Sequence, residues 1–543
     1  MTLNKEVLSL KRIISMALSI LLLFCVIAPF SAYAREQQTS GSCGDNATFE
    51  LKDGVLTISG TGEITSNPWC NMFETTNIYK AIISEGITVV GYSSFSNCTN
   101  LKEVILPHSL KGIKESAFYN CKNLEKADLP SNLKYVGTRA FKACTSLKKI
   151  DLPESLETIY SSAFNGCTSA KGKLFLRKSL YIELYAFSCC KGLEEIVFED
   201  GFTMDNFTSA RALTIFDHCE GVKKLYIPGS MKSIDLRFAY FTSLTDVTIS
   251  EGVEDPPLFY NCNSLEKITL PKSAKDAGSY ESCKKLKSVK IQSKIGVKYP
   301  GSFYNCPNLK SLTFPFGVDS IISYPQSPPM GYIQEEDENG KTIAVPLKGF
   351  KIYGKKCKAL TEYCKKHDFK FIDMYDVKNA KVTGVSSKTY TGKSIKPKIT
   401  VKLVGTELKK GTDYTVKYSN TKKVGTAKVT IKGKGKYKGT LTKTFKINPK
   451  PTELTKLTAK KKGFKAYWKK NKSQTSGYQL QYSIYKSFKN AKKVTVKGYK
   501  TGARTVKDLK SKKKYFVRVR AYKVVDGKKY YSKWSDSKTV RVK

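Results

Sequence analysis

The sequence predicts a mainly β protein in which a stacked-coil solenoid is followed by two antiparallel β-sandwich modules. Three observations lead to this fold class: an aromatic–cysteine–aliphatic motif that returns at nearly constant spacing between Phe95 and Leu309, strand-like segments that end at prolines, and alternating strand patterns with Gly-rich turns after residue 376. A nearly fixed period of this kind is typical of solenoids, where each coil covers the apolar side of its neighbour. A chain of 543 residues is also too long for one compact core.

The N-terminal segment, residues 1–34, predicts a secretory signal peptide. Lys11 and Arg12 precede an apolar run from Ile13 to Phe30, and Ala32-Tyr33-Ala34 offers the small residues of a cleavage site after Ala34. The apolar run is short for a membrane anchor and polar sequence follows it directly. No later stretch is apolar enough to span a bilayer. We therefore expect no membrane span in the mature chain, which is secreted or held non-covalently at the cell surface.

The repeat region is expected over residues 95–373, after an N-terminal cap at residues 41–94. Asp53-Gly54 between two alternating runs predicts a hairpin in that cap. Each repeat places an aromatic residue, a cysteine and an aliphatic residue three positions apart, then a short strand that a proline usually ends. Expected strands include Leu101–Leu106 and Leu147–Leu152.

Nine of the 15 cysteines occupy one position of this repeat. Phe241 fills that position once, and because phenylalanine cannot form a disulfide, the position requires a compact apolar group. We therefore predict a structural ladder of buried thiols, although cysteine-rich exported chains often carry disulfide frameworks. Cys43 and Cys70, in the N-terminal cap, are the candidates for a disulfide. The ladder cysteines are Cys98, Cys121, Cys144, Cys167, Cys190, Cys219, Cys262, Cys283 and Cys306.

Two segments near the end of the repeat region break its pattern. Pro325–Pro346, rich in Pro, Gly and acidic residues, is expected to be an inserted loop. Phe350–Asp373 is expected to form a C-terminal cap of strand, helix near Lys356–His367 and strand, because a solenoid must close its exposed core. Residues 377–448 and 452–543 then show the alternation and turn spacing of antiparallel sandwiches.

The repeat region resembles the BspA-like leucine-rich repeat family. The A-F-x-x-C-x-x-L core stands at Ala117–Leu124 and Ala140–Leu147, and Cys43-Gly-Asp-Asn-Ala47 resembles the start of these proteins. The resemblance covers about residues 41–373 and implies a leucine-rich-repeat solenoid. It also implies a secreted or surface protein, mostly of bacteria, in a family that includes several adhesins but has no single ligand.

The two C-terminal modules resemble known sandwich families. Residues 452–543 resemble fibronectin type III, since Leu509 stands six residues before Tyr515, as in a tyrosine corner, and Trp468 suits the core. Residues 377–448 resemble Ig-like repeats of exported Gram-positive proteins, through segments such as Asp413-Tyr-Thr-Val416.

Positive charge is concentrated in these modules. The net charge is +48, and the chain from Asp376 to Lys543 holds 49 lysines and arginines against seven acids, whereas positions 1–375 hold 45 against 39. All but four of these 49 cations are lysines, which attract polyanions diffusely instead of reading bases. We therefore expect an anionic cell-wall polymer as partner of the basic tail, and no specific nucleic acid.

The sequence holds little catalytic potential. His218 beside Cys219 is the pair most similar to a thiol nucleophile and base, but the ladder position accounts for that cysteine. No metal-ligand or phosphate-loop motif is present, so we expect no cofactor and no enzyme activity. The alternative is a targeting module associated with a cell-wall or glycan-processing enzyme.

The outward side of the repeat strands is the candidate binding face. Period-two alternation directs Leu101 and Val104 inward and turns Glu103 and Ile105 outward. The face is either an ordinary solvated sheet or a contact surface for an extracellular protein or glycan. We interpret the chain as an exported bacterial adhesion or binding protein, with the basic modules as spacer and anchor. The candidate face comprises Glu103, Ile105, Lys126, Asp128, Lys149, Asp151, Lys224, Tyr226, Lys267 and Thr269.

Overall fold

The computed structural model describes residues 39–71, 78–208, 214–298, 301–322 and 328–543. The expected signal peptide, residues 1–34, lies outside these ranges. Contacts between residues divide the chain into two compact units. The first runs to Leu312 and includes Val318–Phe350; the second comprises Thr313–Gly317 and Lys351–Lys543. The C-terminal cap therefore groups with the two sandwich modules and not with the coils that precede it.

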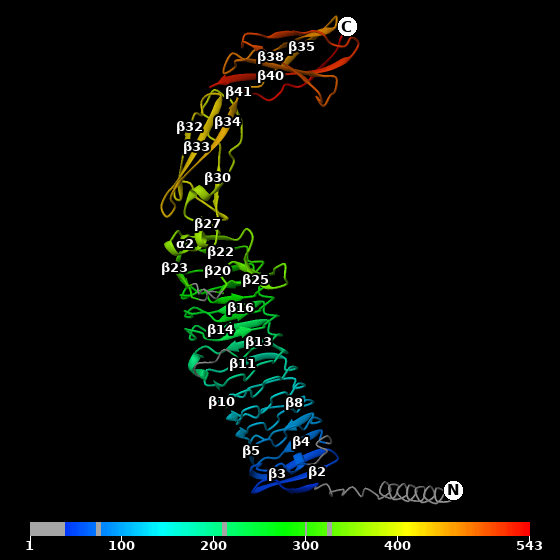
Figure 1. Cartoon of the computed structure of the whole chain (residues 1–543), viewed down its shortest axis with the longest axis vertical. Helices are drawn as coiled ribbons and strands as arrows, with labels where there is room; N and C mark the ends of the chain where they lie inside the picture. The colour runs from blue at the N-terminus through cyan, green and yellow to red at the C-terminus, as the bar shows by residue number, and fades with distance from the viewer. Residues whose placement is uncertain (1–38, 72–77, 209–213, 299–300, 323–327) are drawn as a thin grey trace, which may run out of the picture. The chain divides into compact units, whose positions relative to one another are not determined.

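The first unit is a parallel β-solenoid that begins on a hairpin (Figure 1). Strands β2 (Asn46–Lys52) and β3 (Val55–Glu63) pair antiparallel around Asp53-Gly54, both with positive φ, as a two-residue hairpin turn requires. The start of β3 then pairs in parallel with β4 (Lys80–Ile83), and its end with β5 (Ile87–Val90). One long strand thus starts both walls of the solenoid.

The two walls consist of short parallel strands, one per coil. The first wall continues from β4 through β6 (Glu103–Ile105) and β8 (Lys126–Ala127). Residues 147–152, expected to form its next strand, pair with no neighbour in a named ladder, although Ile150 is buried. Later strands of this wall form pairs in the order β11 (Gly172–Leu176), β13 (Leu193–Phe198), β14 (Lys224–Ile227) and β16 (Asp246–Ile249), followed by β18 (Lys267–Thr269) with β20 (Ser288–Lys290).

The second wall follows the same rule on the other side of the core. From β5 it continues through β7 (Gly112–Ile113), β9 (Tyr135–Val136), β10 (Thr158–Ile159) and β12 (Tyr181–Ile182). In the later coils the ladder aromatic itself lies on a strand, in β15 (Arg237–Ala239), β17 (Leu258–Tyr260) and β19 (Ser279–Glu281).

Stacked aromatic rings fill the interior between the walls. Successive rings lie 5.0 to 6.1 Å apart between centroids, with planes inclined by 2° to 26°. Trp69 of the N-terminal cap continues the series, 5.7 Å from Phe95. Each ring is almost completely buried, so every coil depends on its neighbours for its core. The ladder rings are Phe95, Phe118, Phe141, Phe164, Phe187, Phe216, Phe238, Phe259, Tyr280 and Phe303.

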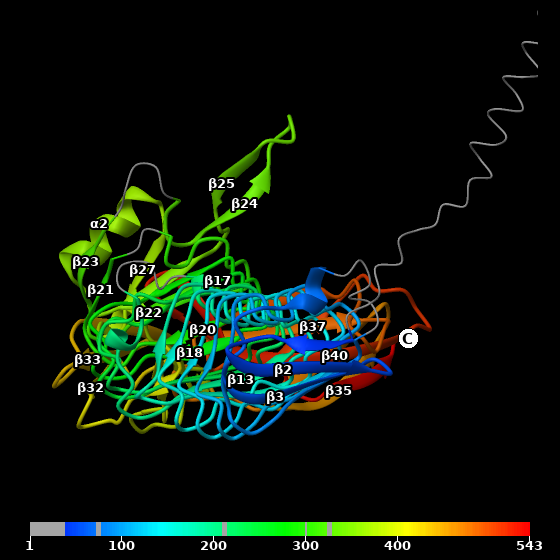
Figure 2. The same cartoon turned by 90° about the horizontal axis from the view of Figure 1, so that it is seen from below.

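The segment predicted as an inserted loop contains regular structure. Strands β24 (Tyr332–Glu336) and β25 (Thr342–Pro346) form an antiparallel hairpin that stands away from the coils (Figure 2). Asp337 organises its turn, because its Oδ1 accepts from the backbone N–H groups of Asn339 and Lys341, 2.9 Å each. The prediction of an inserted loop was wrong for these strands. The acidic, Pro- and Gly-rich composition of the segment gave no sign that its two halves pair.

The C-terminal cap has the predicted order of strand, helix and strand. Strand β26 (Lys351–Gly354) leads into helix α2 (Lys358–Lys366), and β27 (Lys370–Asp373) then pairs in parallel with β26. Leu360 and Cys364 are buried on one face of the helix, as their four-residue spacing dictates. Strand β26 also pairs with β22 (Ser311–Phe314).

The Ig-like module consists of two small sheets. One contains β28 (Lys381–Thr383), β30 (Thr400–Leu403) and β31 (Thr406–Glu407). The other has the order β29 (Lys388–Thr389), β34 (Thr440–Asn448), β33 (Gly425–Gly433) and β32 (Tyr414–Ser419). Val401, Leu403 and Ile431 are among the residues buried between the sheets.

The last module is a sandwich of a three-stranded and a five-stranded sheet. The first holds β35 (Leu454–Lys460), β36 (Gly463–Trp468) and β39 (Ala503–Val506). The second holds β37 (Gly477–Ser483), β38 (Lys492–Lys497), β40 (Lys514–Val525), β41 (Lys528–Tyr531) and β42 (Lys538–Arg541). The Tyr515 hydroxyl accepts from the backbone N–H of Lys510 over 3.4 Å, the bond of a tyrosine corner.

Candidate binding face

The first wall of the solenoid presents the ten candidate residues outward. Strand β6 shows why: Val104 is buried at its centre, so Glu103 and Ile105 on either side must point away from the core. Ile105 is 42% exposed, which leaves an apolar side chain open to solvent on a mostly charged surface. The other candidates on this wall are exposed or half-buried, including the lysines at positions 126, 149, 224 and 267.

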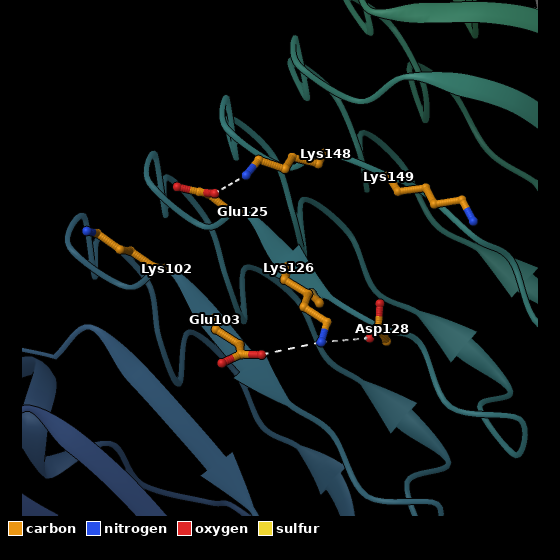
Figure 3. Close-up of a pocket in the computed structure, with 8 residues that line it drawn as sticks. Lys102, Glu103, Glu125, Lys126, Asp128, Lys148 and Lys149 are labelled. Carbon is orange, nitrogen blue, oxygen red and sulfur yellow. Dashed lines mark hydrogen bonds and ion pairs between the residues drawn. The ribbon is translucent and has the colours of Figure 1, made fainter.

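Opposite charges form a connected row across the first coils. The register places Lys80, Glu103 and Lys126 at equivalent positions of β4, β6 and β8. Glu103 lies 2.9 Å from the Lys80 ammonium and 3.4 Å from that of Lys126, which also approaches Asp128 at 3.5 Å (Figure 3). The next coil adds Lys149 with Asp151 at 2.5 Å.

The paired charges change each other's proton affinity. The hydrogen bond from Lys80 holds the pKa of Glu103 below its ordinary value. In turn, the hydrogen bond to Glu103 raises the pKa of Lys126, and the bond to Asp151 raises that of Lys149. Glu103, Lys126 and Lys149 therefore stay charged at neutral pH. The row is close to neutral as a whole, since Lys80, Lys126 and Lys149 alternate with Glu103, Asp128 and Asp151.

A shallow hollow of about 380 Å³ opens on this row. Figure 3 shows the side chains that line it, with Lys126 extended between Glu103 and Asp128. At its rim, Lys148 forms an ion pair with Glu125 of the preceding coil. Three consecutive coils therefore contribute to one surface depression.

The charge alternation continues further along the wall. Glu195, Lys224 and Asp246 occupy equivalent positions of β13, β14 and β16. Beside them the Tyr226 hydroxyl donates to Asp200 Oδ1 over 2.8 Å, which fixes the ring on the surface. The sequence analysis found these outward residues individually but missed that the parallel register brings opposite charges side by side.

The sequence analysis also missed exposed tyrosines on the second wall. Tyr92 is 65% exposed, and Tyr160 and Tyr181 are more than a third exposed. The Lys114 ammonium lies 4.9 Å from the Tyr92 ring centroid and 2.5 Å from Glu63. Each of these tyrosines lies in or beside a strand of this wall, a signal that a scan of the second strand of each repeat could have found.

The nine ladder cysteines are buried, with at most 2% exposure, and none forms a disulfide. Several thiols donate to the backbone carbonyl of the ladder aromatic one coil earlier. Examples are Cys121 to Phe95 at 3.0 Å and Cys190 to Phe164 at 3.2 Å. The thiol is thus a small apolar group that also gives a second donor to a buried carbonyl, which already accepts a backbone N–H of its own coil. This is more than the space-filling role predicted for it.

The predicted disulfide between Cys43 and Cys70 is not supported. Cys43 carries a free thiol with no exposed surface, packed inside the N-terminal cap, and burial raises its pKa to about 11. The side chain of Cys70 lies outside the described part of the chain. Cys43 therefore acts as an apolar core residue, for the same physical reason as the ladder cysteines.

His218 and Cys219 do not form a nucleophile and base. The imidazole of His218 stacks on the Tyr240 ring at 4.1 Å between centroids, on the surface. Cys219 is buried, and desolvation raises its thiol pKa well above the ordinary value. A thiolate is therefore disfavoured at the only cysteine that adjoins a histidine in the sequence.

Neither a metal-binding cluster nor a membrane-spanning helix occurs in the described ranges. Within them, no group of three or more His, Cys, Asp or Glu side chains is arranged to hold a metal ion. Among the same residues, no helix has both the length and the hydropathy needed to cross a membrane.

The comparison with protein families identifies the coils. A model described as the BspA type leucine rich repeat region matches in six copies, over residues 70–194, 174–255 and 212–325. The solenoid belongs to the BspA-type leucine-rich repeat family. This agrees with the spacing of the coils and with the resemblance noted in the sequence. No curated protein matches the chain.

Solved structures of bacterial leucine-rich repeat proteins are similar to the BspA-type solenoid. One from Bacteroides ovatus ATCC 8483 is 20% identical over 61% of this chain and 99% of that chain, with a TM-score of 0.38. One from Eubacterium ventriosum ATCC 27560 is 20% identical over 54% and 92%, with a TM-score of 0.33. A leucine rich cell surface protein from Faecalibacterium prausnitzii A2-165 is 18% identical over 54% and 97%, with a TM-score of 0.25.

Proposed function

We propose that this protein is an exported bacterial binding protein with two separate contact functions. The BspA-type solenoid recognises an extracellular protein or glycan through the outward face of its first wall. The lysine-rich sandwich modules act as spacer and attach the protein non-covalently to an anionic cell-wall polymer. The leader expected at residues 1–34 supports export.

The contrast in ion pairing between the solenoid and the C-terminal modules supports this proposal. On the solenoid, two lysines of the candidate face have carboxylates within ion-pair distance: Lys126 with Glu103 and Asp128, and Lys149 with Asp151. From residue 376 on, seven acids cannot neutralise 49 cations. In the described part of that region, ion pairs are limited to Lys402 with Glu407 and Lys438 with Asp373 of the cap. Unpaired lysines attract a polyanion, whereas paired ones form a polar surface of mixed charge.

Salt dependence tests the anchoring function. The mature full-length chain is incubated with purified Gram-positive cell walls, and the bound fraction is measured between 0.05 and 1 M NaCl. We expect release as salt rises, because the screening length falls from about 8 Å at physiological ionic strength to about 3 Å at 1 M. Full retention at 1 M NaCl would show that electrostatic attraction does not hold the protein.

The recognition function needs a separate test, at a salt concentration that suppresses the tail. Arrays of extracellular matrix proteins and glycans are probed with the full chain and with a charge-reversed face, Lys126→Glu and Lys149→Glu. The matched control reverses Lys134→Glu and Lys111→Glu, which lie beside the second wall. We expect the first variant alone to lose captured ligands. Equal losses in both variants would contradict recognition by the first wall.

A further inference from the structure

Lysine and hydroxyl residues make up one face of the Ig-like module, apart from Asn448 at the end of β34. This face is formed by the outward positions of the adjacent strands β32, β33 and β34. We refer to it as the lysine–threonine face. Its residues are Thr415, Lys417 and Ser419 on β32, Thr426, Lys428, Thr430 and Lys432 on β33, and Thr440, Thr442, Thr444 and Lys446 on β34.

The register arranges these residues so that no two lysines stand directly opposite each other. Lys428 lies between Ser419 and Thr444, and Lys432 lies between Thr415 and Thr440. In the same way, Lys417 faces Thr430 and Lys446 faces Thr426. Each of these lysines therefore has a hydroxyl residue at the paired position of an adjacent strand, where strands are about 4.8 Å apart, and like charges are not juxtaposed.

The core beneath the face holds it in place. Ala427, Val429 and Ile431 alternate with the outward residues of β33 and are completely buried. The hydroxyl groups of Thr430 and Thr442 lie 3.3 Å apart, within hydrogen-bond distance across the strands. The lysines at the four positions are all exposed. The face is thus an ordered sheet surface from which exposed charged side chains project.

Among the described residues, none of the four lysines of this face forms an ion pair with a carboxylate, although Asp526 of the last module lines the same hollow as Lys428. The Ig-like module contains two acids, Glu407 and Asp413. Glu407 pairs with Lys402 of the other sheet at 3.7 Å, and Asp413 accepts from the backbone N–H of Lys409 at 2.8 Å. Both acids are therefore engaged away from the outward positions. The lysines of this face differ in this respect from Lys126 of the solenoid, which has two carboxylate partners.

We propose that the lysine–threonine face binds a polymer of repeating phosphodiesters, which specifies the ligand class and the surface of the anchoring function proposed above and rests on it. Residues two apart on a strand are about 6.8 Å apart, so the face offers donors along each strand as well as across strands. A phosphodiester has one charge and two terminal oxygens, which suit one ammonium and one hydroxyl donor. Residues 377–448 contain no arginine, so the cations of this face act as point charges, the way in which lysine binds phosphate groups.

The test uses the mature full-length chain and purified poly(glycerol phosphate). The face variant carries Lys417→Gln, Lys428→Gln, Lys432→Gln and Lys446→Gln. The control variant loses the same charge at Lys381→Gln, Lys393→Gln, Lys396→Gln and Lys398→Gln, exposed positions of the same module outside the face. We expect the face variant to bind at least tenfold more weakly. The slope of log affinity against log salt should fall by about 3, taking about 0.7 per charge as for single-stranded nucleic acids, and the control should change far less.

A second variant examines the hydroxyl groups without changing charge. Thr430→Val with Thr442→Val keeps side-chain shape and strand propensity but removes two donors from the face. We expect severalfold weaker binding with an unchanged salt slope. Binding unaffected by both this variant and the face variant would overturn the assignment.

The remaining outcomes separate the inference from the function beneath it. Equal losses of affinity in the face and control variants would show that the lysines attract the polymer diffusely. That result would contradict the lysine–threonine face as a specific site but would be consistent with the anchoring function. Tighter binding of polygalacturonate or heparin than of poly(glycerol phosphate) would overturn the phosphodiester class. If the unchanged protein binds none of the three polymers, the proposed anchoring function itself fails.

Discussion

The thiol of Cys144 donates a hydrogen bond of 3.1 Å to the backbone carbonyl of Phe118, the ladder aromatic of the preceding coil. The same bond joins Cys167 to Phe141 and Cys306 to Tyr280. An alanine would leave that buried carbonyl without its thiol donor, and a bulkier aliphatic residue would also lack one. The repeated cysteine therefore combines two requirements, small volume and a donor, that few other side chains meet.

Replacing Cys144 by alanine should lower the free energy of unfolding by about 1–2 kcal/mol, since it removes a buried hydrogen bond and a sulfur atom from the core. Urea unfolding followed by circular dichroism measures the change. Cys189→Ala is the control, because Cys189 is only partly buried and lies outside the ladder. Its effect should stay within about 0.5 kcal/mol. Equal effects at the two positions would contradict a structural role for the ladder thiol.

The ladder should make the solenoid sensitive to alkaline pH. Burial raises the pKa of Cys190 from its ordinary value of 9.0 to about 12, so the folded protein keeps a proton that the unfolded chain releases. The stability contribution is complete below the unfolded pKa and is lost as pH rises between the two values, by about 1.4 kcal/mol per unit for each such group.

Urea midpoints measured between pH 8 and 11 check this expectation. The midpoint should fall steadily above pH 9, and a variant with Cys190→Ala should show a shallower decline. A midpoint that stays constant to pH 11 in the unchanged protein would show that the ladder thiols do not remain protonated in the folded state.

The residue before each ladder cysteine should tolerate glycine and asparagine best. Its φ is positive in coil after coil, 60° at Asn120, 61° at Ala143 and 78° at Gly166. Alanine is strained in this conformation by about 1–2 kcal/mol. We therefore expect Ala143→Gly to stabilise the protein by about 0.5–1 kcal/mol and Asn120→Ala to destabilise it. Thermal unfolding of both variants gives the comparison, and a loss of stability in Ala143→Gly would contradict it.

Trp534 should stabilise the last module through two arginines. Its ring lies 4.8 Å from the guanidinium of Arg518 and 4.2 Å from that of Arg520, which also stacks 3.8 Å from Tyr531. Trp534→Leu should cost about 1–2 kcal/mol, from lost cation–π contacts and apolar area. A double-mutant cycle with Arg520→Gln isolates the coupling, and a coupling near zero would contradict the stacked arrangement.

The periodic features of this protein could be predicted from its sequence because they depend on contacts between equivalent residues. The aromatic, cysteine and aliphatic positions of the repeat, such as Phe118, Cys121 and Leu124, recur at fixed spacing. Their burial follows from the stacking of coils and does not depend on the exact path of each coil. The strand expected at Leu147–Leu152 was wrong, because strand pairing depends on backbone geometry that the side-chain pattern does not determine.

Relationships between coils were harder to anticipate. Glu103 meets Lys80 and Lys126 only because the parallel register aligns equivalent positions of successive coils. Likewise, the sequence of β33 shows alternating lysine and threonine, but not that β32 and β34 place hydroxyl residues opposite each lysine. The hairpin of Ile333 and Val345 was hidden for the same reason, since its pairing crosses an acidic segment.

The parallel stacking of Phe118, Phe141 and Phe164 also bears on how such a protein can change over generations. Each ring meets the same kind of neighbour above and below, so duplication of one repeat unit would create two junctions that already exist elsewhere in the chain. Such an event would lengthen the molecule by about 4.8 Å without a new core having to arise. The length of the solenoid can therefore change by one coil at a time, while the outward residues of each coil remain free to diverge.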